Sequence, residues 1–412
     1  MKKFRLVTLG CKVNQYESQA MRESLLGKGL TETGEDAAEV VVLNTCTVTE
    51  GADRENRYWI RRLRRENPTA KIVVTGCWVE RNRKEAESLS EVDSVLSNQE
   101  KPDLIHLYDW GNPSILEVCL KYAPVIQTAL NHGFYCPGGA LFLKHLNQPC
   151  ERSFGPACLA SAFLTGCNSI RPNRLFGTYL RSQKTKAWSR RMHWIVLSAD
   201  QKKRLTQNGL PDERVIILSP GINLPEKISP MPADPVILFV GRLLHMKGLR
   251  VLLDALKSVK SPATLLVDGE GPDRLSLEAY AKKIGVANRV RFLGWCASEE
   301  HWENYQKSSF VVVPSIWPEP FGLVGIEAMS YSRPVIGSNI GGIPDWLEDE
   351  VTGFLVPPGD SEKLAEKIEI LLKDPLLAHQ MGQQGRQRVE ARHNRKIFAE
   401  ELLKNYQKIC QK

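Results

Sequence analysis

The sequence contains no long uninterrupted run of apolar residues, and this absence argues against a membrane-spanning helix. A span needs about 18 or more consecutive apolar residues, and no stretch of the 412-residue chain approaches that length. The run FRLVTLG, which follows Lys2 and Lys3, is too short for the core of a secretion signal. We therefore expect a cytoplasmic protein whose ten cysteines stay reduced, so that grouped cysteines indicate metal or cluster binding before disulfides.

The sequence also lacks internal repeats, low-complexity tracts and long flexible linkers. Its length, with 42% hydrophobic and 25% charged residues, is typical of a globular chain of roughly two to three domains. The net charge of +8 falls within residues 101–230, because 1–100 and 231–412 each carry equal numbers of basic and acidic side chains. The densest basic stretch, 171–204, is either a solvated helix or a surface for an anionic membrane or substrate. Its basic residues are Arg171, Arg174, Arg181, Lys184, Lys186, Arg190, Arg191, Lys202, Lys203 and Arg204.

Three β-branched apolar runs in the first hundred residues, FRLVTLG, EVVVLNTC and KIVVTGC, end in Gly or Cys. Between them lie polar stretches with helical spacing, at 17–28 and 53–67. This β-α-β-α-β alternation predicts a parallel sheet. The carboxyl ends of parallel strands share one edge, so Cys11, Cys46 and Cys77 should meet there. Their wide spacing matches no zinc finger, and the residues alone leave open metal binding or three small buried strand ends.

Three motifs of this segment, TLGCKVNQYES, VVLNTCTVTEGADRENR and KIVVTGCWVE, resemble the amino-terminal domain of the radical-SAM tRNA methylthiotransferases over about residues 3–100. The resemblance implies that Cys11, Cys46 and Cys77 hold an auxiliary 4Fe-4S cluster with one iron left open. No C-x3-C-x2-C triplet for the SAM cluster follows, and nothing resembles the RNA-binding carboxyl-terminal domain of that family. We therefore expect neither methylthiolation by this chain alone nor tRNA as its partner. The helix RENRYWIRRLRREN interleaves Arg with Glu, which favours a solvated face over a phosphate-binding one.

Short apolar runs recur from Pro235 onward: VILFVG, ATLLVDG, RVRFLG, SFVVVPS, PVIG and GFLVP. Helical stretches, such as 249–259 and 273–284, separate the first three. The alternation predicts a doubly wound α/β domain that binds its ligand in the loops at the carboxyl ends of the strands. In one such loop, VGRLLHMKG, Gly241 turns the chain off its strand while Arg242 and Lys247 bring two cations to the following helix, an arrangement suited to a diphosphate.

A second loop, PEPFGLVGIEAMS, leads into a helix. The backbone amides near Gly322, Leu323 and Val324 would point at the same phosphates. Glu319 precedes the helix and Glu327 lies within it, so the two carboxylates would lie on either side of the ligand. They would accept hydrogen bonds from the hydroxyl groups of a sugar and of a ribose.

The motifs GRLLHMKG, VDGEGPDR, PEPFGLVGIEAM and GGIPDWLEDEVTGFLVPPGD occur in this order. Over residues 235–389 they resemble the donor-binding domain of the retaining glycosyltransferases of family 4, which have the two-domain GT-B fold. The resemblance implies that Arg242 and Lys247 neutralise the leaving diphosphate, that Glu327 holds the nucleotide ribose and that Glu319 holds the donor sugar. It implies no metal, because two cations and a helix amino terminus meet the charge of the leaving group.

Residues 101–225 resemble only the later part of the acceptor domain of that family, through PDLIHLYDW, PVIQTALNHGFYCPGG, WIVLSADQKKRLTQNG and VIILSPGIN. The earlier strands and the glycine-rich first loop are missing. Leu130 and Asn131 replace a His-Asp pair that the family commonly has, and His132 either compensates or is an ordinary loop histidine.

Four further cysteines, Cys136, Cys150, Cys158 and Cys167, follow within this middle segment. Their spacing contains no C-x2-C pair. They either bind a structural metal or pack in the core without a ligand.

We predict an α/β chain that fuses two families: a methylthiotransferase-type domain at 1–100, a partial GT-B acceptor domain at 101–225, a GT-B nucleotide-sugar donor domain at 226–395 and a C-terminal helix at 396–412. The fold is a GT-B-like pair of doubly wound Rossmann-type domains, the first built partly from the methylthiotransferase-type domain. The predicted activity is that of a retaining glycosyltransferase, which moves a sugar from a nucleotide-sugar donor to a saccharide or lipid-linked acceptor. The alternatives are a nucleotide-sugar-binding protein whose catalysis has lapsed, and an iron–sulfur protein of the tRNA-modification type.

The junction near residues 100–103 raises a structural question, because an acceptor domain that begins at PDLIHLYDW exposes the edge of a parallel sheet. The preceding unit has about the size of the missing piece. We therefore expect strands at 4–9, 40–43 and 72–74 to extend the same sheet as the strand at 104–107. Cys11 would then lie where the glycine-rich phosphate loop belongs.

Overall fold

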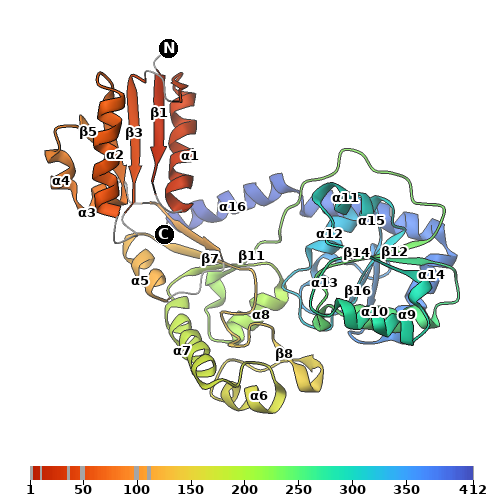
Figure 1. The fold of residues 1–412 in the computed structure, drawn as a ribbon. Coiled ribbons are helices and arrows are strands. Elements are labelled where there is room, and N and C mark those ends of the chain that lie inside the picture. Colours follow the sequence, from red (N-terminus) through yellow and green to blue (C-terminus); the bar gives the residue numbers. More distant parts are fainter. Residues whose placement is uncertain are drawn as a thin grey trace. The chain divides into compact units, whose positions relative to one another are not determined.

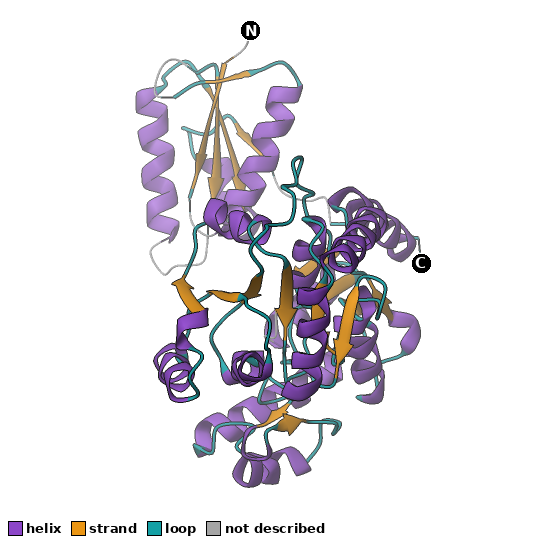
Figure 2. Cartoon of the chain, turned by 90° about the vertical axis from the view of Figure 1, so that its right-hand side faces the viewer, coloured by secondary structure: helices purple, strands orange, loops and turns teal. Residues whose placement is uncertain are grey.

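The chain folds into two compact units, Met1–Lys101 and Pro102–Lys412, as the computed structural model shows (Figure 1). Within each unit, parallel strands lie among covering helices (Figure 2). No helix of the described residues is long and apolar enough to cross a membrane. The described residues are 3–9, 12–34, 38–46, 52–96, 102–108 and 113–411.

The first unit contains β1 (Lys3–Thr8), α1 (Lys12–Gly27), β2 (Thr31–Glu32), β3 (Val40–Thr45), α2 (Ala52–Glu66), β4 (Lys71–Gly76), α3 (Cys77–Arg81), α4 (Arg83–Ser88) and β5 (Ser94–Val95). The strands form one parallel sheet in the order β2-β1-β3-β4-β5. Figure 1 shows α1 and α2 on either side of β1 and β3. Ile60 and Leu63 pack from α2 onto the β-branched strand residues, because their helical spacing puts them on one face. The predicted β-α-β-α-β alternation is confirmed.

The second unit begins with a four-stranded parallel sheet in the order β11-β10-β7-β6. A small antiparallel pair, β8 and β9, lies within the same part of the chain. The elements are β6 (Ile105–Tyr108), α5 (Pro113–Tyr122), β7 (Val125–Ala129), β8 (Phe142–Leu143), η1 (Lys144–Leu146), β9 (Gln148–Pro149), α6 (Ala157–Thr165), α7 (Pro172–Ser189), β10 (His193–Val196), α8 (Ala199–Gln207), η2 (Asp212–Arg214) and β11 (Val215–Ile217).

A six-stranded parallel sheet follows in the order β14-β13-β12-β15-β16-β17. Its first strand along the chain, β12, lies between the second and the fourth, which is the doubly wound order that the sequence predicted. The elements are β12 (Val236–Val240), η3 (His245–Lys247), α9 (Leu249–Ser258), β13 (Thr264–Asp268), α10 (Arg274–Lys283), η4 (Ala287–Arg289), β14 (Val290–Gly294), α11 (Ser298–Gln306), β15 (Phe310–Val313), α12 (Leu323–Ser330), β16 (Val335–Ser338), α13 (Ile343–Trp346), β17 (Gly353–Val356), α14 (Ser361–Lys373), α15 (Pro375–Arg392) and α16 (Arg395–Cys410).

The last helix, α16, packs against the four-stranded sheet rather than against the sheet that precedes it in sequence. Ile409 joins a buried cluster with Ile126 and Ile195 of β7 and β10. Tyr406 places its hydroxyl 2.5 Å from Nδ1 of His106 on β6. The chain therefore crosses back, and the end of the second unit helps to close its beginning.

The prediction that the strands of the first unit extend the same sheet as β6 is wrong. Strands β1, β3 and β4 pair with one another in the five-stranded sheet, whereas β6 belongs to the four-stranded sheet and pairs there with β7. The four-stranded sheet instead ends at β6, a strand of four residues. An edge strand this short exposes few backbone N–H and C=O groups with which another strand could pair. The placement of Cys11 at a phosphate loop rested on the shared sheet and loses its basis; Cys11 also lies outside the described residues.

Candidate functional site

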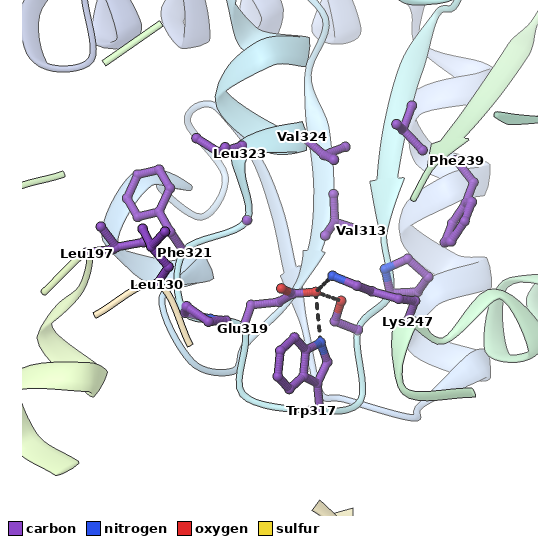
Figure 3. Close-up of a pocket in the computed structure, with 15 residues that line it drawn as sticks. Leu130, Leu197, Phe239, Lys247, Val313, Trp317, Glu319, Phe321, Leu323 and Val324 are labelled. Carbon is purple, nitrogen blue, oxygen red and sulfur yellow. Dashed lines mark hydrogen bonds and ion pairs between the residues drawn. The ribbon is translucent and has the colours of Figure 1, made fainter. Parts of the chain in front are cut away.

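A cavity of about 470 Å³ lies in the second unit at the carboxyl ends of β12 and β15. In the order of the six-stranded sheet these two strands flank the point where the chain reverses its winding direction, which is where open α/β sheets bind ligands. Figure 3 shows the side chains that surround it. The lining residues are Leu130, Leu197, Phe239, Val240, Lys247, Val313, Pro314, Ser315, Trp317, Glu319, Pro320, Phe321, Gly322, Leu323 and Val324.

Glu319 is the buried acidic residue of this cavity, with 5% of its surface exposed. Its Oε1 accepts three hydrogen bonds: from Lys247 Nζ at 2.6 Å, from Ser315 Oγ at 2.7 Å and from Trp317 Nε1 at 2.9 Å (Figure 3). A buried carboxylate needs such donors to offset its lost hydration. The other oxygen, Oε2, takes none of these three bonds.

Close backbone packing fixes the position of Glu319. Gly341 has φ +59°, and a Cβ there would lie 2.4 Å from the carbonyl oxygen of Glu319. That carbonyl also accepts a hydrogen bond of 2.8 Å from the amide of Gly342. Any larger residue at position 341 would therefore push the loop that carries the carboxylate.

The loop that carries Lys247 packs equally closely. Gly248 has φ +74°, and a Cβ there would lie 1.8 Å from the carbonyl oxygen of Pro314. The short helix η3 thus ends against the end of β15 and brings Lys247 to Glu319, 72 positions further along the chain.

The amino terminus of α12 also faces the cavity, through Gly322, Leu323 and Val324. Gly322 adopts φ +93°, and no described side chain caps the helix. Gly325 follows in the first turn, where a Cβ would lie 1.9 Å from the ring of the buried Trp346. The predicted phosphate-facing amides are therefore placed at the cavity, and the backbone packs tightly on Trp346.

Three other predicted site residues are not among the described residues that line this cavity. Arg242 is exposed on the loop after β12, and Gly241 beside it has φ +151°. Glu327 lies further along α12, where Oε2 accepts a hydrogen bond of 2.8 Å from the hydroxyl of Tyr305. Burial raises the pKa of Glu327 above its ordinary value, although the Tyr305 bond opposes this shift. Glu319 and Glu327 therefore lie in different surroundings.

His132 is not among the residues that line the cavity, but it contacts the loop that carries Glu319. The ring is buried: Nε2 lies 2.6 Å from the carbonyl oxygen of Pro318 and Nδ1 lies 2.6 Å from the hydroxyl of Tyr135. Burial lowers the pKa of His132 to about 4, so the neutral ring donates through Nε2 to Pro318 and accepts from Tyr135. The residue thus braces the backbone next to Glu319.

Sequence reasoning missed the partners that position Glu319. Ser315 and Trp317 lie in SIWPEP, directly before the glutamate, and both donate hydrogen bonds to it. Two side-chain donors so close to Glu319 in the sequence could have indicated these partners. Leu130 and Leu197, which come from the ends of β7 and β10, also line the cavity, and their apolar character gave no signal.

The cysteines of the first unit follow the expected strand ends. Cys46 is buried directly after β3, and Cys77 comes directly after β4. The last residues of these strands, Thr45 and Gly76, are register partners, so the two cysteines follow neighbouring positions. A Cβ at Gly76 would lie 2.3 Å from Oδ1 of Asn44, which shows how closely the strand ends approach. The described residues contain no group of three potential metal ligands; Cys11, the third predicted ligand, lies outside them.

Several arginine side chains of helix α2 form ion pairs. Arg57, Arg62 and Arg64 form ion pairs with Glu85, Glu66 and Asp93.

The two parts of the chain match two different families. Residues 223–388 match the family model described as glycosyl transferases group 1, and residues 3–97 match the model described as uncharacterized protein family UPF0004. The chain is therefore a fusion, as predicted.

Different curated relatives match the two segments. The uncharacterized glycosyltransferase MJ1607 of Methanocaldococcus jannaschii is 34% identical over 185 residues, which cover 44% of this chain and 47% of that protein. The threonylcarbamoyladenosine tRNA methylthiotransferase MtaB of Aquifex aeolicus is 41% identical over 103 residues, which cover 25% of each chain. The chain thus spans half or less of the length of these relatives.

Solved structures establish the GT-B fold. Sucrose-phosphate synthase (tll1590) from Thermosynechococcus elongatus aligns with a TM-score of 0.60 and 21% identity over 99% of both chains. Anabaena HepE, solved in complex with UDP and glucose, aligns with a TM-score of 0.55 and 17% identity over 99% of this chain and 100% of that one.

Proposed function

We propose that residues 102–412 act as a retaining glycosyltransferase, which moves a sugar from a nucleoside-diphosphate donor to a saccharide or lipid-linked acceptor. The cavity between β12 and β15 carries this proposal, because Lys247, Glu319 and the uncapped start of α12 face the same space. A diphosphate is held by cations and backbone amides, and a sugar by a buried hydroxyl acceptor. The match to glycosyl transferases group 1 and the UDP-bound HepE structure support the same assignment.

The contacts of Glu319 suggest how the roles are divided. Ser315 and Trp317 are neutral donors that keep the carboxylate in place when Lys247 Nζ turns toward a phosphate. Oε2 then accepts a hydroxyl of the donor sugar. Arg242 adds a second cation from the exposed loop, and Glu327 receives the ribose. Charge that develops on the leaving diphosphate is stabilised by these cations and the helix amino terminus.

Donor turnover by the purified full chain tests this function. Release of nucleoside diphosphate is measured over a panel of UDP-, GDP- and ADP-sugars, and the anomeric configuration of the product by NMR. We expect release with one donor class and retained configuration, with loss in Arg242→Ala and Glu319→Gln but not in Lys257→Ala, an exposed α9 position. Binding without turnover would favour the nucleotide-sugar-binding alternative, and failure to bind every donor would remove both.

We further propose that the first unit holds an iron–sulfur cluster on Cys11, Cys46 and Cys77. The two described members follow adjacent parallel strands, and β1, which precedes Cys11, is the next strand in the same sheet. Thiolates are the usual cluster ligands. Anaerobic reconstitution with iron and sulfide should give visible charge-transfer absorbance that the triple Cys→Ser variant lacks. Equal iron loading of that variant would assign the iron to other cysteines. The methylthiotransferase activity of the relatives is not part of this proposal.

The basic stretch 171–204 supports a peripheral contact with an anionic membrane, which suits a lipid-linked acceptor. Phe176 and Leu180 of α7 are 54% and 53% exposed, and the neighbouring Arg174 and Arg181 are exposed as well. Exposed apolar and basic side chains on one helix are typical of membrane-surface segments. Arg204 does not contribute, because it is buried and bonds to Asp200 at 2.7 Å.

A further inference from the structure

Four cysteines of the second unit surround one small cavity of about 30 Å³. They reach it from separate places along the chain: a turn after β7, the end of β9, helix α6 and the turn after α6. All four are free thiols, although their sequence spacing had no recognisable metal-binding pattern. The residues are Cys136, Cys150, Cys158 and Cys167.

All four cysteine side chains line the same cavity, and each is partly buried. They therefore form one group rather than four separate core residues.

Backbone contacts hold the segments that carry these cysteines together. The amide of Gly139 donates to the carbonyl oxygen of Cys136 at 2.9 Å, and the amide of Cys150 donates to that of Leu141 at 2.7 Å. The turn after Cys136 is also tightly packed, because a Cβ at Gly138 would lie 2.1 Å from the carbonyl oxygen of Cys167. The positions of Cys136, Cys150 and Cys167 around the cavity are therefore fixed by the backbone.

The surrounding segment has little regular structure of its own. Between β7 and α7 the described chain forms two strands of two residues, one short 3-10 helix and the nine-residue α6. Phe163 and Leu164 of α6 are 60% and 73% exposed, so that helix buries only part of its apolar surface. Structural metal sites commonly stabilise segments whose hydrophobic core is this small.

We propose that Cys136, Cys150, Cys158 and Cys167 together bind one zinc ion as a structural site. Four thiolates are a common ligand set for structural zinc, and four cysteines line this one small cavity. The described side chains do not yet stand as a set of three or more metal ligands. Binding therefore turns the thiols inward, and each gives up its proton as its Zn–S bond forms.

Hydrogen bonds to backbone carbonyl groups also connect the proposed zinc site to the cavity that contains Glu319. The amide of Cys136 donates to the carbonyl oxygen of His132 at 2.9 Å, and His132 in turn bonds to the carbonyl of Pro318, next to Glu319. An ordered Cys136 turn thus holds the histidine that supports the catalytic loop. The metal itself has no part in the transfer reaction, so this inference stands independently of the proposed activity.

The test uses the full chain carrying Cys11→Ser, Cys46→Ser and Cys77→Ser, so that the first unit contributes no thiolate ligands. We expect one zinc per chain by elemental analysis, and after exchange with Co²⁺ the visible bands of a tetrahedral thiolate site. Adding Cys150→Ser and Cys158→Ser should abolish both signals. Adding Cys119→Ser and Cys410→Ser, two cysteines outside the cavity, should leave both unchanged.

A second measurement needs no further variant and so does not depend on the folding of the Cys150→Ser, Cys158→Ser protein. Titration of the chain that retains the four cysteines with a mercurial should release the zinc as four thiols react. Absence of zinc, release without thiol modification, iron–sulfur absorbance in place of zinc, or a disulfide among the four would each overturn the proposal.

Discussion

Lys247 and Glu319 form an ion pair, with Nζ of the lysine 2.6 Å from Oε1 of the glutamate. Nζ also lies 5.3 Å from the centre of the Trp317 ring, whose indole N–H bonds to the same carboxylate oxygen. The cation and the carboxylate that the proposed mechanism assigns to phosphate and sugar therefore neutralise each other in the structure. A donor must draw Lys247 away, whereas Glu319 keeps its two neutral donors.

Replacing Lys247 by Ala should weaken nucleoside-diphosphate binding by roughly 1.5–3 kcal/mol, the size of a hydrogen bond to a charged group. Isothermal titration calorimetry with the nucleotide of the active donor measures this change. Lys257→Ala, an exposed change on α9, is the matched control and should bind normally. We expect a similar loss for Arg242→Ala, and unchanged affinity in both Lys247→Ala and Arg242→Ala would remove the diphosphate assignment.

Glu319→Ala should separate nucleotide binding from use of the sugar. The change releases Lys247 from its ion pair, so affinity for the nucleoside diphosphate should be retained, while turnover of the donor sugar is lost with its hydroxyl acceptor. Calorimetry and the nucleotide-release assay measure the two effects on the same protein. Glu303→Ala, at an exposed position of α11, should change neither. A large loss of nucleotide affinity in Glu319→Ala would contradict this division of roles.

Gly325→Ala should destabilise the second unit, because the added methyl group would lie 1.9 Å from the ring of Trp346. Overpacking of this kind costs roughly 1–3 kcal/mol. The matched change is Gly177→Ala in α7, where a Cβ meets nothing within 4 Å; there the helix should gain roughly 0.5–1 kcal/mol. Thermal unfolding should show a lower midpoint for the first variant and an unchanged or higher one for the second. Equal midpoints would show that the Trp346 packing adapts freely.

The sequence predicted those features that depend on local pattern. Apolar β-branched runs marked the strands, and the loops after β12 and β15 held Lys247 and Glu319 because the ends of parallel strands converge. The contacts of side chains within those loops were not predictable in the same way. Glu327 is eight positions after Glu319, and its hydrogen bond from the hydroxyl of Tyr305 has no signal in the loop sequence.

The sequence also did not predict which strands of the two units pair with one another. The size of the first unit suggested that it completes the truncated sheet, but size does not determine which backbone edges meet, and β1, β3 and β4 had partners within their own segment. The four cysteines show the opposite case. Their spacing indicated no site, and only the folded turns around α6 bring Cys136 and Cys167 to one cavity.

Membrane contact through α7 predicts binding to anionic vesicles. The full chain should sediment with phosphatidylserine-containing vesicles and not with neutral ones, and added salt should weaken the effect. Phe176→Ser with Leu180→Ser should reduce binding by removing the exposed apolar pair. Leu376→Ser, at a 66% exposed position of α15, controls for loss of any surface leucine. Sedimentation that is unaffected by the α7 changes would place the membrane surface elsewhere.

Acidification should loosen the docking of α16 on the four-stranded sheet. Burial lowers the pKa of His106 to about 4 from an ordinary value of 6.5, so the unfolded chain binds a proton between these values that the folded chain does not. The stability that depends on neutral His106 is therefore complete above pH 6.5 and is lost as the pH falls toward 4. The neutral ring contacts Tyr406 Oη at 2.5 Å and Thr128 Oγ1 at 2.7 Å, and its protonation should cost on the order of 2 kcal/mol. Urea unfolding at pH 7.5 and pH 5 should show a smaller difference in His106→Gln than in the parent chain, because glutamine does not titrate; equal differences would show that another group controls the acid response.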